Sequence, residues 1–487
     1  MIIDLPIIVC GKVISINERE TILIKNENGV NVRLPLLNER DVDEILSSRL
    51  KTGLAEMPFD DITIFFEKLA AFWLQEDNPF RDEAVKLCSQ ITGFPEAVVL
   101  RDYKLIVYLF RHRGDVYDQL ETEIGNRWFI DEWVPSQSCI IRALPRGLVT
   151  NILVGNIPLV SSFGLYRNLV VKNNSLSKVP KKDPVSAIYF ALSLLEIDPN
   201  HPVSKSVSVA YWEKDSWQEE KFLSNSDAVC LWGGEAAINE LKAKIKMGTK
   251  VLEYGPKKSL TLADLSLIDP GDSLRDISLR MAHDFSVYNQ EACFTPQELY
   301  LVADDNRFAD FIEHLQLALN RYLNIYQKGV ISSDSKAHVL LTRTEARLMG
   351  NTVISTSDHG WTIIVAHDKK RLESHPLSRT VIIHRVAKLE EAMEHINRYT
   401  QTVTLYPWKS SEQLRDLICG QGADRICALG MANLPRTGFP HDGIWTFNEL
   451  LRWVNVERDL DFKGKYVNVD KDAWVERLFR NETISLY

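Results

Sequence analysis

The thiol of Cys293 is the side chain in this sequence whose surroundings best suit covalent chemistry. It follows a short polar run, Tyr288-Asn289-Gln290-Glu291, and does not lie inside an apolar stripe. An exposed thiolate can act as a nucleophile and hold a substrate as a thioester. Cysteine is also among the residues most often buried in a core. The local sequence therefore leaves two alternatives, a catalytic thiol or a packing residue.

Two polar side chains near the ends of expected strands could serve the same chemistry. Asn156 follows an apolar strand, and its amide could donate a hydrogen bond to a developing oxyanion. A turn residue that satisfies its own backbone is the alternative for Asn156. Glu253 ends another strand beside Tyr254-Gly255 and could act as a general base toward a thiol. A solvated strand end is the alternative for Glu253.

Two further positions have the character of a phosphate-binding site. Lys172 follows the apolar residues 169–171, where we expect a strand to end, and its ammonium could bind a phosphate or a ribose hydroxyl. A solvated strand end is again the alternative. Gly233-Gly234 lie between an expected strand and an expected helix, a geometry that presents backbone N–H groups to a pyrophosphate. The full G-x-G-x-x-G pattern is absent, so this signal alone is weak.

The bulk composition is that of an ordinary globular protein with two or three domains. The chain has 487 residues, 45% of them hydrophobic and 25% charged, and a net charge of −9. The negative charge argues against a nucleic acid as the main partner. No apolar run approaches the roughly 18–20 residues that a membrane span needs. The first residues lack the basic segment and the cleavage site of a signal peptide, so a β-strand is the better interpretation.

The cysteines indicate the redox compartment in which the protein is expected. The seven cysteines form no C-x-x-C pair and have no clustered histidine partner. This spacing supports neither a disulfide framework nor a structural zinc site. We therefore expect a cytoplasmic protein with reduced thiols and no bound metal.

The elements expected around the candidate residues are those of an α/β protein. The first 40 residues alternate as β-structure does, and residues 60–120 have a helical period. From residue 139 on, apolar strands alternate with amphipathic helices, which indicates parallel sheets covered on both faces, in two α/β domains that meet near residue 255. The expected strands are 139–141, 149–154, 169–171, 207–210, 228–231, 250–253, 299–302, 361–365, 380–383 and 403–406, and the expected helices are 183–195, 216–223, 234–246, 273–286, 305–326 and 388–398.

Taken in order, these segments resemble the aldehyde dehydrogenase superfamily. The likeness is carried by six short segments, at residues 142–147, 155–159, 168–175, 233–235, 252–257 and 289–293. The chain is more similar to one branch of that superfamily, the long-chain acyl-protein thioester reductases of bacterial bioluminescence. The residues that carry this closer resemblance are 288–297 and the late segment 430–443, and the overall length agrees.

The resemblance implies a fold and a division of the chain. We expect an aldehyde-dehydrogenase-like α/β fold, with a Rossmann-type cofactor domain, an α/β catalytic domain and a small oligomerisation element. Residues 1–256 would form the N-terminal segment and the NADP-binding domain, which would also receive residues 440–487. Residues 257–439 would form the catalytic domain that carries Cys293.

The resemblance also implies an activity and roles for the candidate residues. Cys293 would hold a long-chain acyl group as a thioester, which NADPH would reduce to the fatty aldehyde used by a luciferase. The Asn156 amide would stabilise the oxyanion, and Glu253 would transfer a proton. Ser175 stands where NAD-preferring members often place a glutamate, so a 2′-phosphate would be tolerated and could pair with Lys172. The turn at Gly233 and Gly234 would hold the pyrophosphate.

By the same resemblance, the partners would be an acyl-protein synthetase and an acyl transferase in a fatty-acid reductase complex. The chain itself would form an oligomer, with residues 128–135 and 466–469 as candidate interface pieces. A CoA-acylating aldehyde dehydrogenase or an acyl-phosphate reductase is the nearest alternative. A non-catalytic acyl-carrier scaffold is an alternative of a different class.

Overall fold

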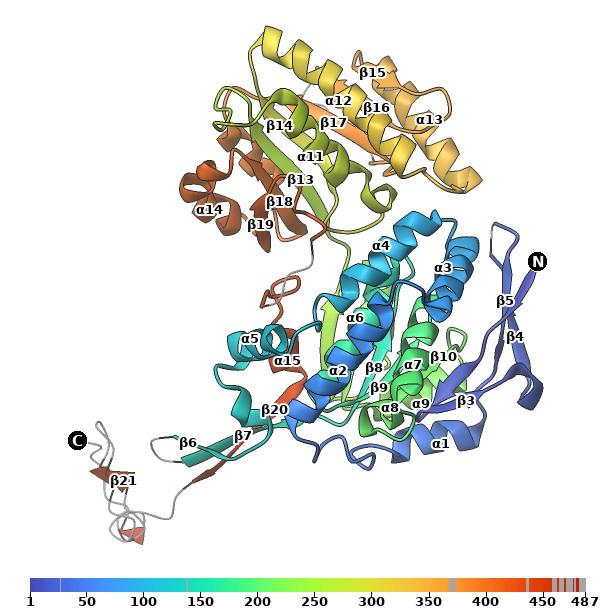
Figure 1. Cartoon of the computed structure of the whole chain (residues 1–487). Helices are drawn as coiled ribbons and strands as arrows, with labels where there is room; N and C mark the ends of the chain where they lie inside the picture. The colour runs from blue at the N-terminus through green and yellow to red at the C-terminus, as the bar shows by residue number, and fades with distance from the viewer. Residues whose placement is uncertain are drawn as a thin grey trace.

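The protein consists of two lobes and a projecting arm (Figure 1). The computed structural model describes residues 1–26, 28–136, 139–367, 374–434 and 438–457, with 462–463, 468–469, 476 and 479–480 beyond them. Each lobe is built around a seven-stranded, mostly parallel sheet. The first sheet ends along the chain with a strand at Tyr254, and the second begins at Lys258.

The sheet of the first lobe has the strand order β12-β11-β8-β9-β10-β2-β3. Its five strands from β12 to β10 are parallel, whereas β2 and β3 join antiparallel at the edge. The central strands are buried along their whole length, so both faces of the sheet are covered. The strands are β2 (Ile7–Val9), β3 (Lys12–Ile14), β8 (Leu148–Ile152), β9 (Asn174–Lys178), β10 (Val207–Ala210), β11 (Ala228–Trp232) and β12 (Lys250–Tyr254).

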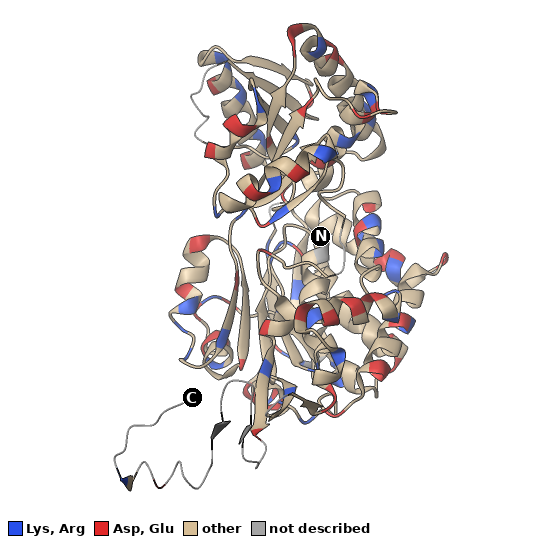
Figure 2. Ribbon diagram, turned by 90° about the vertical axis from the view of Figure 1, so that its left-hand side faces the viewer, with Lys and Arg blue, Asp and Glu red and all other residues tan. Residues whose placement is uncertain are grey.

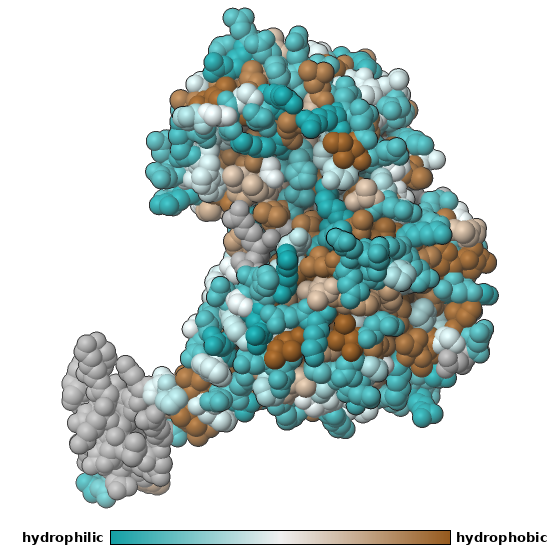
Figure 3. Space-filling view, viewed as in Figure 1, coloured by the Kyte–Doolittle hydropathy of each residue, from teal (hydrophilic) through white to brown (hydrophobic). Residues whose placement is uncertain are grey.

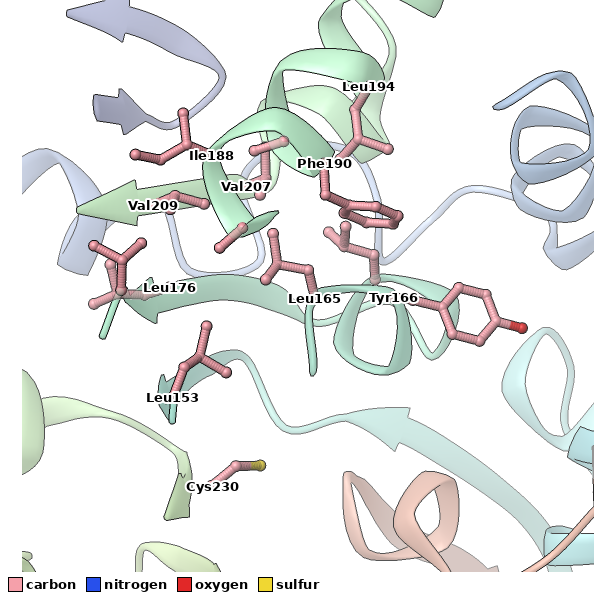
Figure 4. Close-up of a cluster of buried hydrophobic side chains, with 14 of the residues drawn as sticks. Leu153, Leu165, Tyr166, Leu176, Ile188, Phe190, Leu194, Val207, Val209 and Cys230 are labelled. Atoms are coloured by element: carbon pink, nitrogen blue, oxygen red, sulfur yellow. The ribbon is translucent and has the colours of Figure 1, made fainter. Parts of the chain in front are cut away.

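Helices cover this sheet through large apolar side chains. Leu165 of α6, Phe190 of α7 and Val209 of β10 belong to one buried cluster (Figure 4). The helices of this lobe are α1 (Glu39–Ser47), α2 (Phe59–Leu74), α3 (Pro79–Thr92), α4 (Glu96–Val107), α5 (Arg113–Ile124), α6 (Pro158–Val170), α7 (Val185–Ile197), α8 (Pro202–Lys205), α9 (Trp217–Asn225) and α10 (Glu235–Lys242). A small sheet of β1 (Ile2–Asp4), β5 (Asn31–Pro35) and β4 (Thr21–Ile24) stands beside them.

One expected strand is wrong, and the strand that replaces it was not expected. Residues 169–171 belong to the end of helix α6 and the turn after it, and the strand is β9, with the sequence Asn-Ser-Leu-Ser-Lys. Polar residues can form this buried strand because Asn151 Nδ2 donates to Ser175 Oγ at 3.3 Å and to Ser177 Oγ at 3.0 Å. This correction moves the end of the strand from Lys172 to Lys178.

The second lobe repeats the layered plan with the order β15-β16-β17-β14-β13-β18-β19. Its strands are β13 (Lys258–Asp264), β14 (Pro296–Val302), β15 (Thr352–Ser355), β16 (Thr362–Ala366), β17 (Thr380–Arg385), β18 (Thr400–Tyr406) and β19 (Arg425–Ala428). Its helices are α11 (Leu274–Ser286), α12 (Asp305–Ile325), α13 (Ser333–Leu348) and α14 (Ser411–Gly420). The helix expected at 388–398 is a shorter 3-10 segment, η4 (Leu389–His395).

After the second lobe the chain returns to the first. Strand β20 (Leu451–Glu457), preceded by α15 (Thr446–Glu449), pairs antiparallel with β7 (Cys139–Pro145), and β6 (Val134–Pro135) completes the arm (Figure 1). Trp128 and Trp133, in one of the segments predicted to form an interface, are exposed at the base of this arm. Of the other predicted interface piece, 466–467 lie outside the described residues, and 468–469 form the short strand β22 (Asn468–Val469).

Both lobes carry residues of both charges. Lys and Arg are interspersed with Asp and Glu along the ribbon in Figure 2. Among the helices that the structure describes, none combines the length and the apolar character that crossing a membrane requires.

Tyr166 tests the packing of the first-lobe core. Its side chain is 0% exposed, and its hydroxyl has no hydrogen-bond partner among the described residues. An unsatisfied buried hydroxyl costs about 1–3 kcal/mol, so we expect Tyr166→Phe to raise the free energy of unfolding by about 1 kcal/mol. Tyr103→Phe is the matched control, because the Tyr103 hydroxyl lies 3.0 Å from Ser186 Oγ and its loss should destabilise. The free energy of unfolding of each variant is measured by urea denaturation. A lower value for both variants than for the unchanged protein would contradict this account.

Candidate active site

A cavity lies between the two lobes, where the surface is hollowed in Figure 3. Strands β8 and β11 are neighbours in the first sheet, but the chain leaves β8 toward β9 and β10 before it returns to β11. Such a reversal opens a crevice at the carboxyl ends of the two strands, which is where open α/β sheets bind ligands. The loop after β8 supplies Asn156 to the cavity, and the loop after β11 supplies Gly233 and Gly234.

The second lobe supplies Cys293 to the same cavity. The residues before it, in η3 (Val287–Gln290), include three consecutive left-handed positions, with φ of 50° at Tyr288, 51° at Asn289 and 67° at Gln290. Such positions are costly for residues with a Cβ, and they persist only where their surroundings enforce them. All three side chains are buried. The polar run is therefore an internal support for the thiol and not an exposed loop.

Hydrogen bonds hold this support in place. Gln290 Nε2 donates to the carbonyls of Pro296 at 2.9 Å and Thr380 at 2.8 Å, and Thr380 N donates to Gln290 Oε1 at 2.7 Å. Asn289 Oδ1 accepts from Arg379 Nε at 2.9 Å. The Tyr288 hydroxyl donates to the carboxylate of Asp102 in the first lobe. The loop that carries Cys293 is thus anchored to both lobes.

The Cys293 thiol is half-buried, and among the described residues one side chain donates a hydrogen bond to it. Gln401 Nε2 donates to Cys293 Sγ at 3.1 Å, and Ser259 Oγ donates to the Cys293 carbonyl at 2.6 Å. Burial raises the pKa of the thiol to about 12, and the nearby charge of Asp442 adds to this rise. The hydrogen bonds from Gln401 and from the backbone of Cys293 and Phe294 oppose the rise. At neutral pH the thiol is therefore protonated at rest.

Asn156 lies beside the loop that carries Cys293. Its Nδ2 donates to the carbonyl of Glu291 at 2.9 Å, two residues before Cys293. Its Oδ1 is buried, with no hydrogen-bond partner in the part of the chain that the structure describes. The structure thus brings together the amide and the thiol that the sequence singled out, although they are far apart in the chain.

The Gly233-Gly234 turn leaves open space beside its backbone. Gly233 has φ +153°, and a Cβ added to either glycine would meet no atom within 4 Å. Helix α10 begins directly after the turn, at Glu235. Trp232 stacks on Tyr254 with ring centroids 3.9 Å apart and forms a wall next to the turn. The turn can therefore present backbone N–H groups to an extended anionic ligand.

Lys172 and Ser175 are not at this cavity, and the cofactor role predicted for them does not fit the structure. Lys172 follows a helix at the amino end of β9, opposite to the edge where ligands bind. Its ammonium forms an ion pair with Asp131 and donates to the Ile130 carbonyl at 3.1 Å, with only 2% of the side chain exposed. Ser175 is buried inside β9, where Asn168 Nδ2 donates to its Oγ at 3.0 Å.

Glu253 also departs from its predicted role. Side chains alternate along a strand, so β12 turns Tyr254 toward the cavity and Glu253 away from it. The Glu253 carboxylate is exposed and pairs with Lys242 Nζ at 2.7 Å. A transfer of a proton between Glu253 and Cys293 does not agree with this placement.

Several residues of the cavity have no role assigned from the sequence, among them Arg167, Gln401, His441 and Asp442. The His441 ring contacts Trp232 and Tyr254, with centroids at 5.3 Å and 5.1 Å, and burial lowers its pKa so far that the ring is neutral. The Arg167 guanidinium stacks on Phe163, with Cζ 3.5 Å from the ring centroid. The segment 430–443 carries part of the family resemblance, but the sequence alone assigns no role to its pair His441-Asp442.

A substitution of Lys172 separates a structural role from a cofactor role. Lys172→Met leaves the Asp131 carboxylate without its buried partner, so we expect the free energy of unfolding to fall by about 3 kcal/mol. The KM for the nicotinamide cofactor that the resemblance implies should not change, because the ammonium does not reach the cavity. Lys12→Met is the control, since Lys12 pairs with Glu44 at the surface and its loss should cost less than about 1 kcal/mol. A rise in KM without a loss of stability would restore the cofactor role.

Comparison with known folds places the two lobes in a common architecture. The structure is similar to the aldehyde dehydrogenase KauB from Pseudomonas aeruginosa, with a TM-score of 0.73 and 14% identity, over 94% of this chain and 97% of that one. It is also similar to an NADP-dependent glyceraldehyde-3-phosphate dehydrogenase from Bacillus halodurans, with a TM-score of 0.70 and 14% identity, over 93% and 99% of the two chains. The fold is that of the aldehyde dehydrogenases.

Sequence relatives cover almost the whole chain. The long-chain acyl-protein thioester reductase of Vibrio harveyi is 32% identical over 469 residues, 96% of each protein. The protein of the same name from Photobacterium phosphoreum is 31% identical over 472 residues, 96% of this chain and 94% of the relative. The family model described as acyl-CoA reductase (LuxC) matches residues 54–453. This chain therefore belongs to the acyl-CoA reductase (LuxC) family, on an aldehyde dehydrogenase fold.

Proposed function

We propose that this protein is an oxidoreductase that reduces a long-chain fatty acyl group, held as a thioester on Cys293, to the fatty aldehyde, with NADPH as the reductant. The observation that carries the proposal is that the Cys293 thiol and the Gly233-Gly234 turn line one cavity at the switch point of the first sheet. The relatives named long-chain acyl-protein thioester reductases support the substrate class. The role in supplying the aldehyde of bacterial bioluminescence is what the family resemblance of the sequence implies.

The acyl group arrives by exchange at the thiol. Cys293 Sγ attacks the carbonyl carbon of the acyl donor, and a C–S bond forms while the bond to the donor's leaving group breaks. The leaving group takes the proton of the thiol, so the step releases no proton and needs no separate base to accept one. Since burial raises the pKa of Cys293 to about 12, this proton must leave as the C–S bond forms.

The reduction uses the amide next to the thiol. NADPH supplies a hydride when it is bound. The carbonyl oxygen of the thioester then gains a negative charge, which in this proposal is stabilised by the backbone N–H of Cys293 and by the Asn156 amide, whose Nδ2 donates one hydrogen to the Glu291 carbonyl in this structure. Such donors are each worth about 2.7–4 kcal/mol of transition-state stabilisation. When the C–S bond breaks, the aldehyde leaves and Sγ recovers a proton as the resting thiol.

The residues at the cavity fit a dinucleotide. The open space beside Gly233 and Gly234 admits a pyrophosphate close to the backbone N–H groups at the start of α10. A preference for NADPH over NADH is supported by the carboxyl end of β9, where Lys178 ends the strand and Lys181 and Lys182 lie in the loop after it. Their ammonium groups pair with Glu219, Glu213 and Glu291, and a 2′-phosphate at this ligand-binding edge could take the place of one of these carboxylates.

Partners and assembly belong to the same proposal. An acyl-protein synthetase would deliver the acyl group, and an acyl transferase would supply the fatty acid, as the family resemblance of the sequence implies. The name of the relatives, acyl-protein thioester reductase, agrees with an acyl group that is delivered by a protein. The arm of β6, β7 and β20 presents exposed strand edges and exposed tryptophans at its base, which suits contact with a second copy of the chain.

The description of the family as acyl-CoA reductases favours one alternative, a direct reaction with acyl-CoA. Aldehyde formation from acyl-CoA alone would support this alternative. Dependence on an acyl-protein synthetase with ATP would support the first proposal.

Acylation of Cys293 is the decisive test. We expect mass spectrometry after incubation with a labelled long-chain acyl donor to find one acyl group on Cys293, and NADPH to remove it. Cys293→Ala should abolish both labelling and aldehyde formation. Cys419→Ala is the matched control, since Cys419 lies exposed on α14, and it should be acylated like the unchanged protein. Labelling and aldehyde formation that persist in Cys293→Ala would refute the proposal.

The choice of nucleotide can be measured independently. With the charges after β9 as the physical reason, we expect kcat/KM for NADPH to exceed that for NADH by at least about tenfold, a difference of about 1.4 kcal/mol. Steady-state reduction of one acyl donor at saturating concentration gives both values. Equal values for the two nucleotides would remove the 2′-phosphate from the proposal and leave the rest unchanged.

A further inference from the structure

We propose that Gln401 stabilises the negative charge on Cys293 Sγ and that Asp442 is a positioning residue that holds the Gln401 amide in the required orientation. The inference concerns the thiol itself and deepens the proposed function, on which only its catalytic consequences rest. It supplies a stabilising group for a thiol that has no histidine among its hydrogen-bond partners in the described part of the chain.

The geometry links three side chains from three parts of the chain. Gln401 is the second residue of β18, its side chain is buried, and its Nε2 lies 3.1 Å from Cys293 Sγ. The same Nε2 donates to Asp442 Oδ1 at 2.5 Å. The two hydrogens of one amide nitrogen are thus divided between the nucleophile and a carboxylate.

The carboxylate determines which end of the amide faces the thiol. A side-chain amide has a donor end and an acceptor end, and an ionised carboxylate only accepts. If the Gln401 amide were reversed, its Oε1 would face both the Asp442 oxygen and the sulfur, and two hydrogen bonds would be lost. Asp442 therefore holds the N–H toward Sγ.

The groups around Gln401 and Asp442 shift the pKa of the Asp442 carboxyl in opposite directions. Burial raises the pKa of Asp442, while the Gln401 hydrogen bond, Lys257 and Arg167 oppose the rise. Lys257 Nζ also pairs with Asp424 at 2.8 Å, and Arg167 Nε and Nη1 have no hydrogen-bond partner among the described residues. The charged and titratable groups that line the cavity together with Cys293 are Arg167, Tyr254, Lys257, Glu291, Asp424, Arg425, His441 and Asp442.

The sulfur carries developing charge at two moments in the proposed reaction. As the acyl group arrives, the S–H bond is broken, and as the aldehyde leaves, the electron pair of the C–S bond returns to sulfur. A hydrogen bond to a charged group is stronger than one to a neutral group. Gln401 thus acts on the sulfur, whereas Asn156 is placed to act on the carbonyl oxygen.

Alkylation of Cys293 by iodoacetamide, followed by mass spectrometry over a range of pH, measures this effect without cofactor or acyl donor. Gln401→Met keeps the length of the side chain and removes the donor. Loss of a hydrogen bond to a charged group should lower the thiolate population about 10- to 100-fold. The remaining thiolate is more nucleophilic, so the net alkylation rate at fixed pH should fall about 3- to 10-fold.

Two controls and a second variant make this result specific. Gln421→Met makes the same change at an exposed position, and the alkylation rate of exposed Cys419 serves as a reference within each protein. Gln401→Glu should slow the alkylation of Cys293 at least as much as Gln401→Met, because it places a carboxylate beside the sulfur. Unchanged pH–rate profiles for Cys293 in both Gln401 variants would overturn the proposal.

The role of Asp442 is tested by two variants in two backgrounds. Asp442→Asn removes the charge but keeps an oxygen that can accept from Gln401, whereas Asp442→Leu removes both. With Gln401 present, we expect Cys293 to react faster in Asp442→Asn than in Asp442→Leu. With Gln401→Met, this difference should vanish. A difference of equal size in both backgrounds would show that Asp442 does not act through Gln401 and would overturn its positioning role.

These results are separable from the proposed function. If the unchanged protein is never acylated but its alkylation depends on Gln401 as described, the proposed function fails and the inference about the thiol stands. If acylation and reduction occur but the alkylation rate of Cys293 does not change in the Gln401 variants, the inference fails and the proposed function stands.

Discussion

The hydrogen bonds of the Gln290 side chain are the constraint on which the site depends. They join the turn before Cys293 to the backbone at the start of β14 and β17, so the sheet of the second lobe fixes the position of the thiol. Three left-handed residues in a row would each cost on the order of 1–3 kcal/mol without such enforcement. Burial of the thiol at this position raises its pKa. The place in which the turn holds the thiol is therefore also one that suppresses its ionisation.

The return of the chain to the first lobe completes the site. Strand β20 pairs with β7 over seven residues and so fixes the end of the segment that carries His441 and Asp442. Gln401 comes from the second lobe, and the Gly233-Gly234 turn comes from the first. The cavity is thus shared by the two lobes and the returning segment, and a change in the angle between the lobes would alter the contact between Gln401 and Asp442.

Sequence analysis predicted the parts of the site that depend on local signals. A thiol after a polar run, an amide after an apolar strand and a double glycine before a helix all line the cavity. It placed Lys172 wrongly because α6 is buried almost all round, and its last residues have the apolar character of a strand. The true strand β9 is polar, and only cross-strand partners such as Asn151 make its burial possible. Gln401 lies 108 positions from Cys293, and no local pattern indicates that contact.

A neutral donor suits a thiol that must be inert at rest and reactive when the acyl group arrives. A lysine at position 401 would stabilise the thiolate permanently and would pair with Asp442, and a standing thiolate is the form most open to oxidation. An amide gains little from a protonated sulfur and more from a charged one. The Gln401 amide therefore stabilises mainly the states in which the S–H or C–S bond is breaking. Only an interaction that is stronger in such a state than in the resting state lowers the barrier. In the mechanism proposed here, burial keeps the thiol protonated between turnovers, and Gln401, held by Asp442, stabilises the charge on sulfur during them.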